Sequence, residues 1–195
     1  MKVLYCCLLI SMLLLGLLNH FNIMNDAILL NLRFEQTTIS NGDYWRLLSG
    51  HIVHLNLPHT LMNIGALSLL MIMFWKDISY PIDLIALIFS TIGINIGLFF
   101  FHPELSSYAG FSGVLHGLFL FYFLKTFPEN NKASVIAITV IGLKIIWEQT
   151  PWADNSETAA LIGGSVATMS HLYGGICGLL AGISYLFVQR NKPRY

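Results

Sequence analysis

The chain has 195 residues, of which 55% are hydrophobic and 10% are charged, and its ten basic and ten acidic side chains leave no net charge. This composition provides too little polar surface for a soluble domain of this size, so it predicts an integral membrane protein. The balanced charge, with no basic stripe before the C-terminal tail, argues against a nucleic-acid-binding surface. The cysteines lie in apolar runs, where a thiol behaves as a small hydrophobe, and they predict neither a disulfide nor a metal site: Cys6, Cys7 and Cys177.

Apolar runs that approach the ~20 residues needed to cross a bilayer recur along the whole sequence. They predict an all-α, polytopic membrane protein with six transmembrane helices in a single domain, residues 1–195. The expected helices cover residues 3–24, 59–75, 82–101, 112–127, 133–147 and 166–188. The first run follows Lys2 but precedes no small-residue cleavage site, so we expect a helix there rather than a signal peptide.

The orientation of the chain is predicted from the cations in its short loops. Outer loops would hold only Arg33 and Arg46 if the N-terminus is inside. The cytoplasmic ends would then hold Lys2, Lys76, Lys125, Lys132, Arg190, Lys192 and Arg194. This asymmetry predicts that both termini are cytoplasmic.

Two connections are unusual for a simple helical bundle. The outer loop at 25–58 contains "GDYWRLLSGHIVHLNLPH", which is amphipathic and too long for a turn, so we expect it to fold on or partly into the membrane. The fourth helix begins within "GFSGVLHG", and its 16 residues rise about 24 Å against a hydrocarbon core of about 30 Å. Ser112 is therefore predicted to lie below the outer surface, at a site that is reachable from outside.

A buried serine becomes a nucleophile only if a base comes within hydrogen-bond reach. The candidate bases within the bilayer are His59, His116 and His171. His116 lies four residues after Ser112, on the same helical face. By proximity alone, His116 would be chosen as the base.

For His171, the route to the serine would be helix packing. It lies at the outer end of a stripe of small residues on the last helix, Gly174, Gly178 and Gly182. Gly113 and Gly117 offer a matching surface on the fourth helix, and contact between these stripes would bring His171 to the level of Ser112. Such stripes also occur in plain helix packing, but an ionisable residue inside the membrane favours a functional site.

Further polar residues lie at the start of the second helix. His59 and Asn63 form an i, i+4 pair that can donate hydrogen bonds to an oxyanion, although alone they could equally cap or bridge helices. A metal site is the rival interpretation because His51, His54 and His59 are close in sequence. No H-E-x-x-H motif and no neighbouring carboxylate accompany them, so the sequence predicts no metal. A serine, a histidine base and oxyanion donors suffice for acyl transfer, so no cofactor is expected either.

Together these residues resemble the rhomboid intramembrane serine proteases. The resemblance covers Tyr44 to Gly182 and rests on four ordered motifs: Trp45-Arg46, then His54, His59 and Asn63, then Gly110, Ser112 and Gly113, then His171, Gly174 and Gly178. It implies a six-helix rhomboid-like bundle, with a Ser-His dyad that has no acidic third member. By this resemblance Ser112 is the nucleophile and His171 the base, and the oxyanion is held by His59, Asn63 and the backbone N–H of Ser112.

The sequence departs from the common rhomboid pattern at His116, since many rhomboids have a tyrosine there that stacks on the catalytic histidine. The short chain and the "GFSGVLHG" motif look most like the rhombosortase branch, which is thought to cleave C-terminal Gly-Gly sorting tails that carry a transmembrane helix. This resemblance implies a bacterial inner-membrane protease that acts on a transmembrane protein within the lipid bilayer. It leaves open whether His116 supports the ring of His171 or titrates with it.

Other classes of membrane protein compete with this interpretation. A non-catalytic rhomboid-like protein would bind membrane helices or serve quality control without cutting, but such relatives usually lack the serine or the histidine, and both are present here. A small transporter would show paired interrupted helices related by an internal repeat, and we find no convincing repeat. The sequence leaves the natural substrate and the oligomeric state open.

Overall fold

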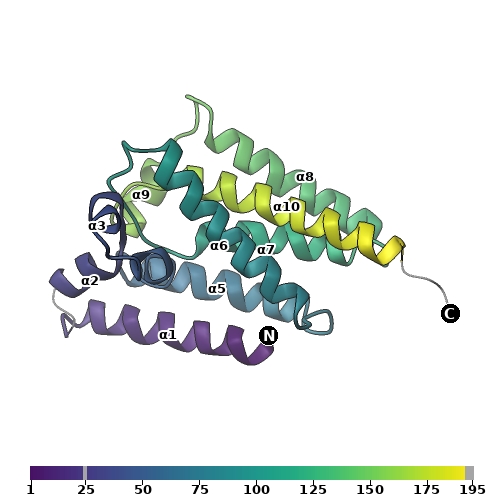
Figure 1. Ribbon diagram of the computed structural model, residues 1–195, viewed down its shortest axis with the longest axis horizontal. Helices are drawn as coiled ribbons and strands as arrows, with labels where there is room; N and C mark the ends of the chain where they lie inside the picture. The colour runs from purple at the N-terminus through teal and green to yellow at the C-terminus, as the bar shows by residue number, and fades with distance from the viewer. Residues whose placement is uncertain (24–25, 192–195) are drawn as a thin grey trace.

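The computed structural model of the protein describes residues 1–23 and 26–191. The predicted end of the first helix at Met24 and the predicted cytoplasmic residues Lys192 and Arg194 lie outside this range. In the described part, six long helices form the body of the molecule (Figure 1). They are α1 (Lys2–His20), α5 (Leu57–Met73), α6 (Ile82–Phe101), α7 (Ser112–Lys125), α8 (Asn131–Glu148) and α10 (Thr168–Arg190).

Each of the six predicted helices has a counterpart, with ends shifted by a few residues. The largest shift is at α1, which ends at His20 rather than near residue 24. The predicted long loop is itself structured, because it contains α2 (Asp26–Leu32), α3 (Gln36–Ser40) and α4 (Arg46–Ser49), and a further short helix follows α8, namely α9 (Ser156–Ile162).

A small β-ribbon corrects the expectation of a purely helical fold. Strand β1 (Phe34–Glu35) pairs antiparallel with β2 (Ser107–Tyr108), and Phe34 lies opposite Tyr108. Strands of two residues are too short to leave an alternating pattern in the sequence, so the prediction missed them. The ribbon joins the segment between α2 and α3 to the loop before α7, where the candidate serine lies.

Length and hydropathy distinguish three of the long helices from the other three. Among the described residues, α1, α6 and α10 are long and apolar enough to cross a membrane, with mean hydropathy values of 2.0, 2.3 and 1.5. The apolar helices α5 and α7 are shorter, at 17 and 14 residues. Helix α8 has 18 residues but carries Lys132, Lys144 and Glu148. The protein is thus an integral membrane protein, and a full set of six crossings belongs to the proposal below.

The start of the first helix and the end of the last helix lie at the same end of the bundle. Helix α1 begins and α10 ends at the same end of the bundle, whereas α2, α3 and α9 lie at the opposite end (Figure 1). At the former end, Lys2 places its Nζ 4.7 Å from the ring centroid of Trp75, which follows α5. The first and last long helices thus bring both ends of the described chain to one end of the bundle.

Buried polar groups tie three helices together near that end. The ammonium group of Lys125 on α7 donates to Asp83 Oδ1 on α6 at 2.5 Å, and the Asp83 side chain is fully buried. The hydroxyl of Tyr122 donates to Asp83 Oδ2 at 2.5 Å and lies 3.2 Å from the hydroxyl of Tyr5 on α1. Removing one member of such a network leaves a buried charge or polar group without its partner, which is strongly destabilising.

The two glycine stripes meet, as the sequence predicts. A Cβ atom added at Gly174 would collide with the carbonyl oxygen of Gly113, and one added at Gly178 would collide with that of Gly117. The backbones of α7 and α10 therefore touch directly, which small residues alone permit. This contact sets the height at which His171 meets α7.

Candidate active site

The loop before α7 turns sharply at Gly110. Its φ of +123° lies in a region that residues with a side chain rarely adopt, and its N–H donates to Gly50 O at 2.9 Å. A Cβ atom at Gly110 would also lie 2.7 Å from Nε2 of His59. The position needs glycine both for its backbone conformation and for the close approach of the His59 ring.

Ser112 is the first residue of α7. The first N–H groups of a helix have no intrahelical acceptor and lie at the positive end of the helix dipole. The backbone at Ser112 therefore offers N–H donors to a negatively charged group. A nucleophile at this position has such donors beside it without any further side chain.

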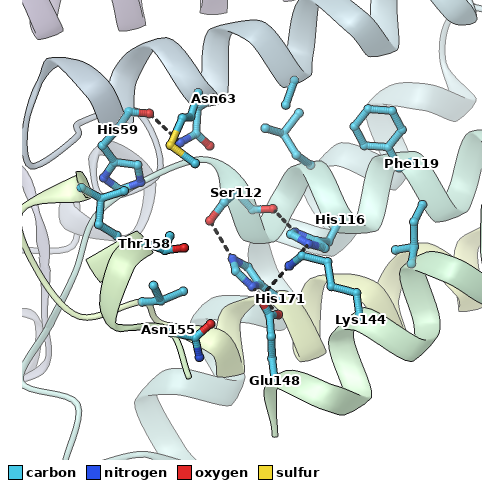
Figure 2. A pocket seen from close by; sticks show the side chains of 16 residues that line it. His59, Asn63, Ser112, His116, Phe119, Lys144, Glu148, Asn155, Thr158 and His171 are labelled. Atoms are coloured by element: carbon cyan, nitrogen blue, oxygen red, sulfur yellow. Dashed lines mark hydrogen bonds and ion pairs between the residues drawn. The ribbon is translucent and has the colours of Figure 1, made fainter. Parts of the chain in front are cut away.

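The serine faces the histidine of the last helix. Oγ of Ser112 lies 3.0 Å from Nε2 of His171, within hydrogen-bond distance (Figure 2). Only 7% of the His171 side chain is exposed. The close packing of α7 on α10 thus brings together two residues that are 59 positions apart in the sequence.

The predicted oxyanion donors lie across the same cavity from the serine (Figure 2). The N–H of His59 donates to the side chain of Asn56, which caps the start of α5, and Nδ2 of Asn63 donates to His59 O at 3.0 Å. Within the described chain, His59 Nδ1 and Asn63 Oδ1 are buried without a hydrogen-bond partner. Asn63 Oδ1 can only accept, so the donor that Asn63 can offer to an oxyanion is the second N–H of its Nδ2, whereas His59 can donate through Nδ1 when that nitrogen carries the ring proton.

The cavity has a volume of about 400 Å³ and lies between α5, α7, α8 and α9, with His171 from α10. Its wall is mostly apolar, with Met62, Leu115, Phe119 and Ile141 among the lining residues. Ser112, His171, His59 and Asn63 all line it. The structure therefore gathers every predicted site residue around one space.

Known proteins are similar to this chain over most of its length. The sequence profile of the rhomboid domain matches residues 41–188, which include the glycine stripes and the four motif residues that line the cavity, His59, Asn63, Ser112 and His171. The chain belongs to the rhomboid family. It is similar to a protein of Bacillus subtilis (strain 168) named "Putative rhomboid protease YdcA", with 26% identity over 161 residues that cover 80% of this chain and 74% of that protein.

His116 of this rhomboid stacks on the candidate base. The rings of His116 and His171 lie 4.1 Å apart between centroids at an interplanar angle of 23°. Nδ1 of His116 lies 2.7 Å from Ser112 O, and its Nε2 lies 3.1 Å from Nζ of Lys144. A carbonyl accepts and an ammonium donates, so His116 is neutral, with its proton on Nδ1. His116 therefore stacks on the ring of His171, and its hydrogen bond to Ser112 is made to the carbonyl rather than to the hydroxyl.

An acidic residue that the sequence analysis missed contacts the other side of His171. Oε2 of Glu148 lies 2.8 Å from His171 Nδ1, and Oε1 accepts from Nζ of Lys144 at 2.6 Å (Figure 2). The prediction ended this helix at residue 147, and the family resemblance implied no acidic partner. The sequence did contain one indication that Glu148 is functional. Lys144 and Glu148 are spaced i, i+4 on a mostly apolar helix, where ionisable residues favour function.

Three potential metal ligands lie close together at this site. Among residues 1–23 and 26–191, the one group with three potential ligand atoms within 4.8 Å of one another is His116, Glu148 and His171. The ammonium group of Lys144 already bonds two of them, so a metal ion would have to displace a cation of the protein itself.

The alternative histidines do not converge on one point. His51 bonds Asn95 through Nε2 at 3.1 Å, and burial lowers the pKa of His51 to about 4. His54 packs edge-to-face on His59, with 4.9 Å between ring centroids. His51 therefore anchors the loop to α6 as a neutral hydrogen-bonding group, rather than joining a ligand set with the other two.

Proposed function

We propose that this rhomboid is an intramembrane serine endopeptidase in which Ser112 is the nucleophile and His171 the general base. The observation that carries the proposal is the 3.0 Å separation of Ser112 Oγ and His171 Nε2 at the wall of a cavity. A serine needs a base at this distance to attack a peptide carbonyl. Family membership supports the same reaction class, and no cofactor is required for it.

The proposed reaction proceeds through an acyl-enzyme. Ser112 Oγ attacks the carbonyl carbon of the substrate while its proton passes to Nε2 of His171. The resulting oxyanion accepts hydrogen bonds from the N–H of Ser112 and from the side chains of His59 and Asn63. The C–N bond then breaks as His171 returns the proton to the leaving amine. Water, deprotonated by His171, hydrolyses the ester and releases the new carboxyl end.

The proposed substrate is a membrane-anchored protein with glycine or other small residues just outside an apolar helix and basic residues after it. A helical carbonyl is already hydrogen-bonded and shielded, so the cut segment must unwind, and glycine costs about 1 kcal/mol more than alanine in a helix. The likeness of "GFSGVLHG" to rhombosortases supports C-terminal Gly-Gly sorting tails as this substrate. Six crossings, cytoplasmic termini and a bacterial inner membrane complete the proposal.

The nucleophile is tested by a fluorophosphonate probe on the purified protein. We expect the wild type to be labelled and Ser112→Ala to be unlabelled with an unchanged melting temperature. Ser165→Ala is the matched control, because Ser165 is an exposed serine that lines a second pocket together with Ser112, and it should label like the wild type. Labelling of Ser112→Ala would show that another residue is the nucleophile and would remove the basis of the proposal.

The substrate class is tested with a membrane-anchored reporter. Replacing its boundary glycines by leucine should slow cleavage strongly, and adding a helix-breaking residue nearby should partly restore it. Equal cleavage of the glycine and leucine reporters, with insertion of both verified, would contradict the unwinding mechanism. A wild type that binds the reporter without cutting it would favour the non-catalytic, helix-binding alternative.

A further inference from the structure

We propose that Glu148 is a positioning residue that converts the Ser112–His171 pair into a triad by fixing the tautomer of His171. The inference rests on the proposed function and departs from the two-residue mechanism that the family resemblance implies. The Glu148 carboxylate lies 2.8 Å from His171 Nδ1, and 8% of its side chain is exposed. It is therefore a shielded acceptor directed at the ring nitrogen that faces away from the serine.

The tautomer follows from what a carboxylate can do. An ionised carboxylate only accepts hydrogen bonds, so the proton of a neutral His171 must be on Nδ1. Nε2 then carries a lone pair that points at Ser112 Oγ, 3.0 Å away, and can take the hydroxyl proton. When His171 becomes an imidazolium during the reaction, Glu148 also faces the new positive charge.

Lys144 fixes the carboxylate in turn. Its ammonium donates to Glu148 Oε1 at 2.6 Å and to His116 Nε2 at 3.1 Å, and His116 bonds back to the carbonyl of Ser112. The hydrogen bonds thus form a closed ring that begins and ends at Ser112 (Figure 2). With Oε1 held by Lys144, only Oε2 of Glu148 is directed at His171.

Glu148→Gln tests which ring nitrogen of His171 carries the proton. Lys144 determines how the new glutamine amide is oriented. The ammonium of Lys144 only donates, so it should hold the amide oxygen of the new glutamine and turn the NH₂ group toward His171. Nδ1 must then accept, and the ring proton moves to Nε2, where it blocks proton transfer from Ser112. We expect kcat to fall by about 10²–10⁴ with little change in KM, since the equivalent change in a Ser-His-Asp triad costs about 10⁴.

Lys144→Met provides the diagnostic second change. In Glu148→Gln/Lys144→Met the amide is free to turn its oxygen toward His171, so we expect the double variant to be at least about tenfold more active than Glu148→Gln alone. Glu148→Asp, which keeps the carboxylate, should also retain more activity than Glu148→Gln. Glu157→Gln makes the same chemical change at an exposed residue and should match the wild type.

A readout independent of proteolysis separates this inference from the proposed function. We expect ¹⁵N spectra of histidine-labelled protein, assigned with His171→Ala, to show His171 protonated on Nδ1 in the wild type and on Nε2 in Glu148→Gln. An unchanged tautomer, or a Glu148→Gln variant within threefold of wild-type kcat, would overturn the inference. If Ser112 proves not to be the nucleophile, the spectra still decide whether Glu148 sets the tautomer.

Discussion

Gly110→Ala should damage catalysis more than folding, because two separate constraints meet at this residue. An alanine at a φ of +123° costs about 1–3 kcal/mol of backbone strain. For a chain of this length that corresponds to a fall in melting temperature of about 2–12 °C. The new Cβ would lie 2.7 Å from His59 Nε2, whereas ordinary contact begins at 3.4 Å, so the ring must move by about 0.7 Å. A misplacement of about 1 Å costs about 10²-fold, and we expect kcat to fall about 10–10²-fold.

Gly42→Ala separates the effect of backbone strain from the effect of the contact with His59. Gly42 also has a positive φ, +112°, but apart from its chain neighbours no atom of the residues that the structure describes lies within 4 Å of its added Cβ. This variant should lose stability by a similar amount and retain the kcat of the wild type. The assay is reporter cleavage in detergent, with melting curves of the same samples. Full kcat in Gly110→Ala, or an equal loss of kcat in both variants, would refute the role of the His59 contact.

Three further changes test the site and its support. Asn63→Ala should lower kcat by about 10²–10³ with little change in KM in reporter kinetics, and a change confined to KM would contradict an oxyanion role. Asp83→Leu leaves Lys125 buried without its carboxylate and should reduce the free energy of unfolding by about 3–5 kcal/mol. Thermal unfolding should show that Asp83→Leu/Lys125→Met recovers most of this loss, because the unpaired charge is removed as well. Gly178→Leu should separate α10 from α7 and abolish fluorophosphonate labelling, and retained labelling would show that the close helix contact is dispensable.

The order and approximate limits of the six long helices could be predicted from the sequence because each depends on a local run of apolar residues. Helix α6 begins and ends where the sequence predicts, at Ile82 and Phe101. The meeting of Gly113 and Gly117 with Gly174 and Gly178 was also predictable, since matched small residues are what a close crossing requires. Short elements such as the β1–β2 ribbon were not, because two residues carry no periodicity.

Ordered motifs in the sequence determined which residues gather at the site, and they selected His171 over the nearer His116. The tertiary structure decided what surrounds His171. Glu148 and Lys144 come from a helix that no motif marks, and they reach the site because α8 packs beside α7 and α10. Hydrogen-bond partners across helices depend on how the helices are rotated and translated against one another, which local patterns do not encode. For the same reason only the fold showed that His116 stacks on His171 as a neutral support, with its own nitrogens bonded to Ser112 and Lys144.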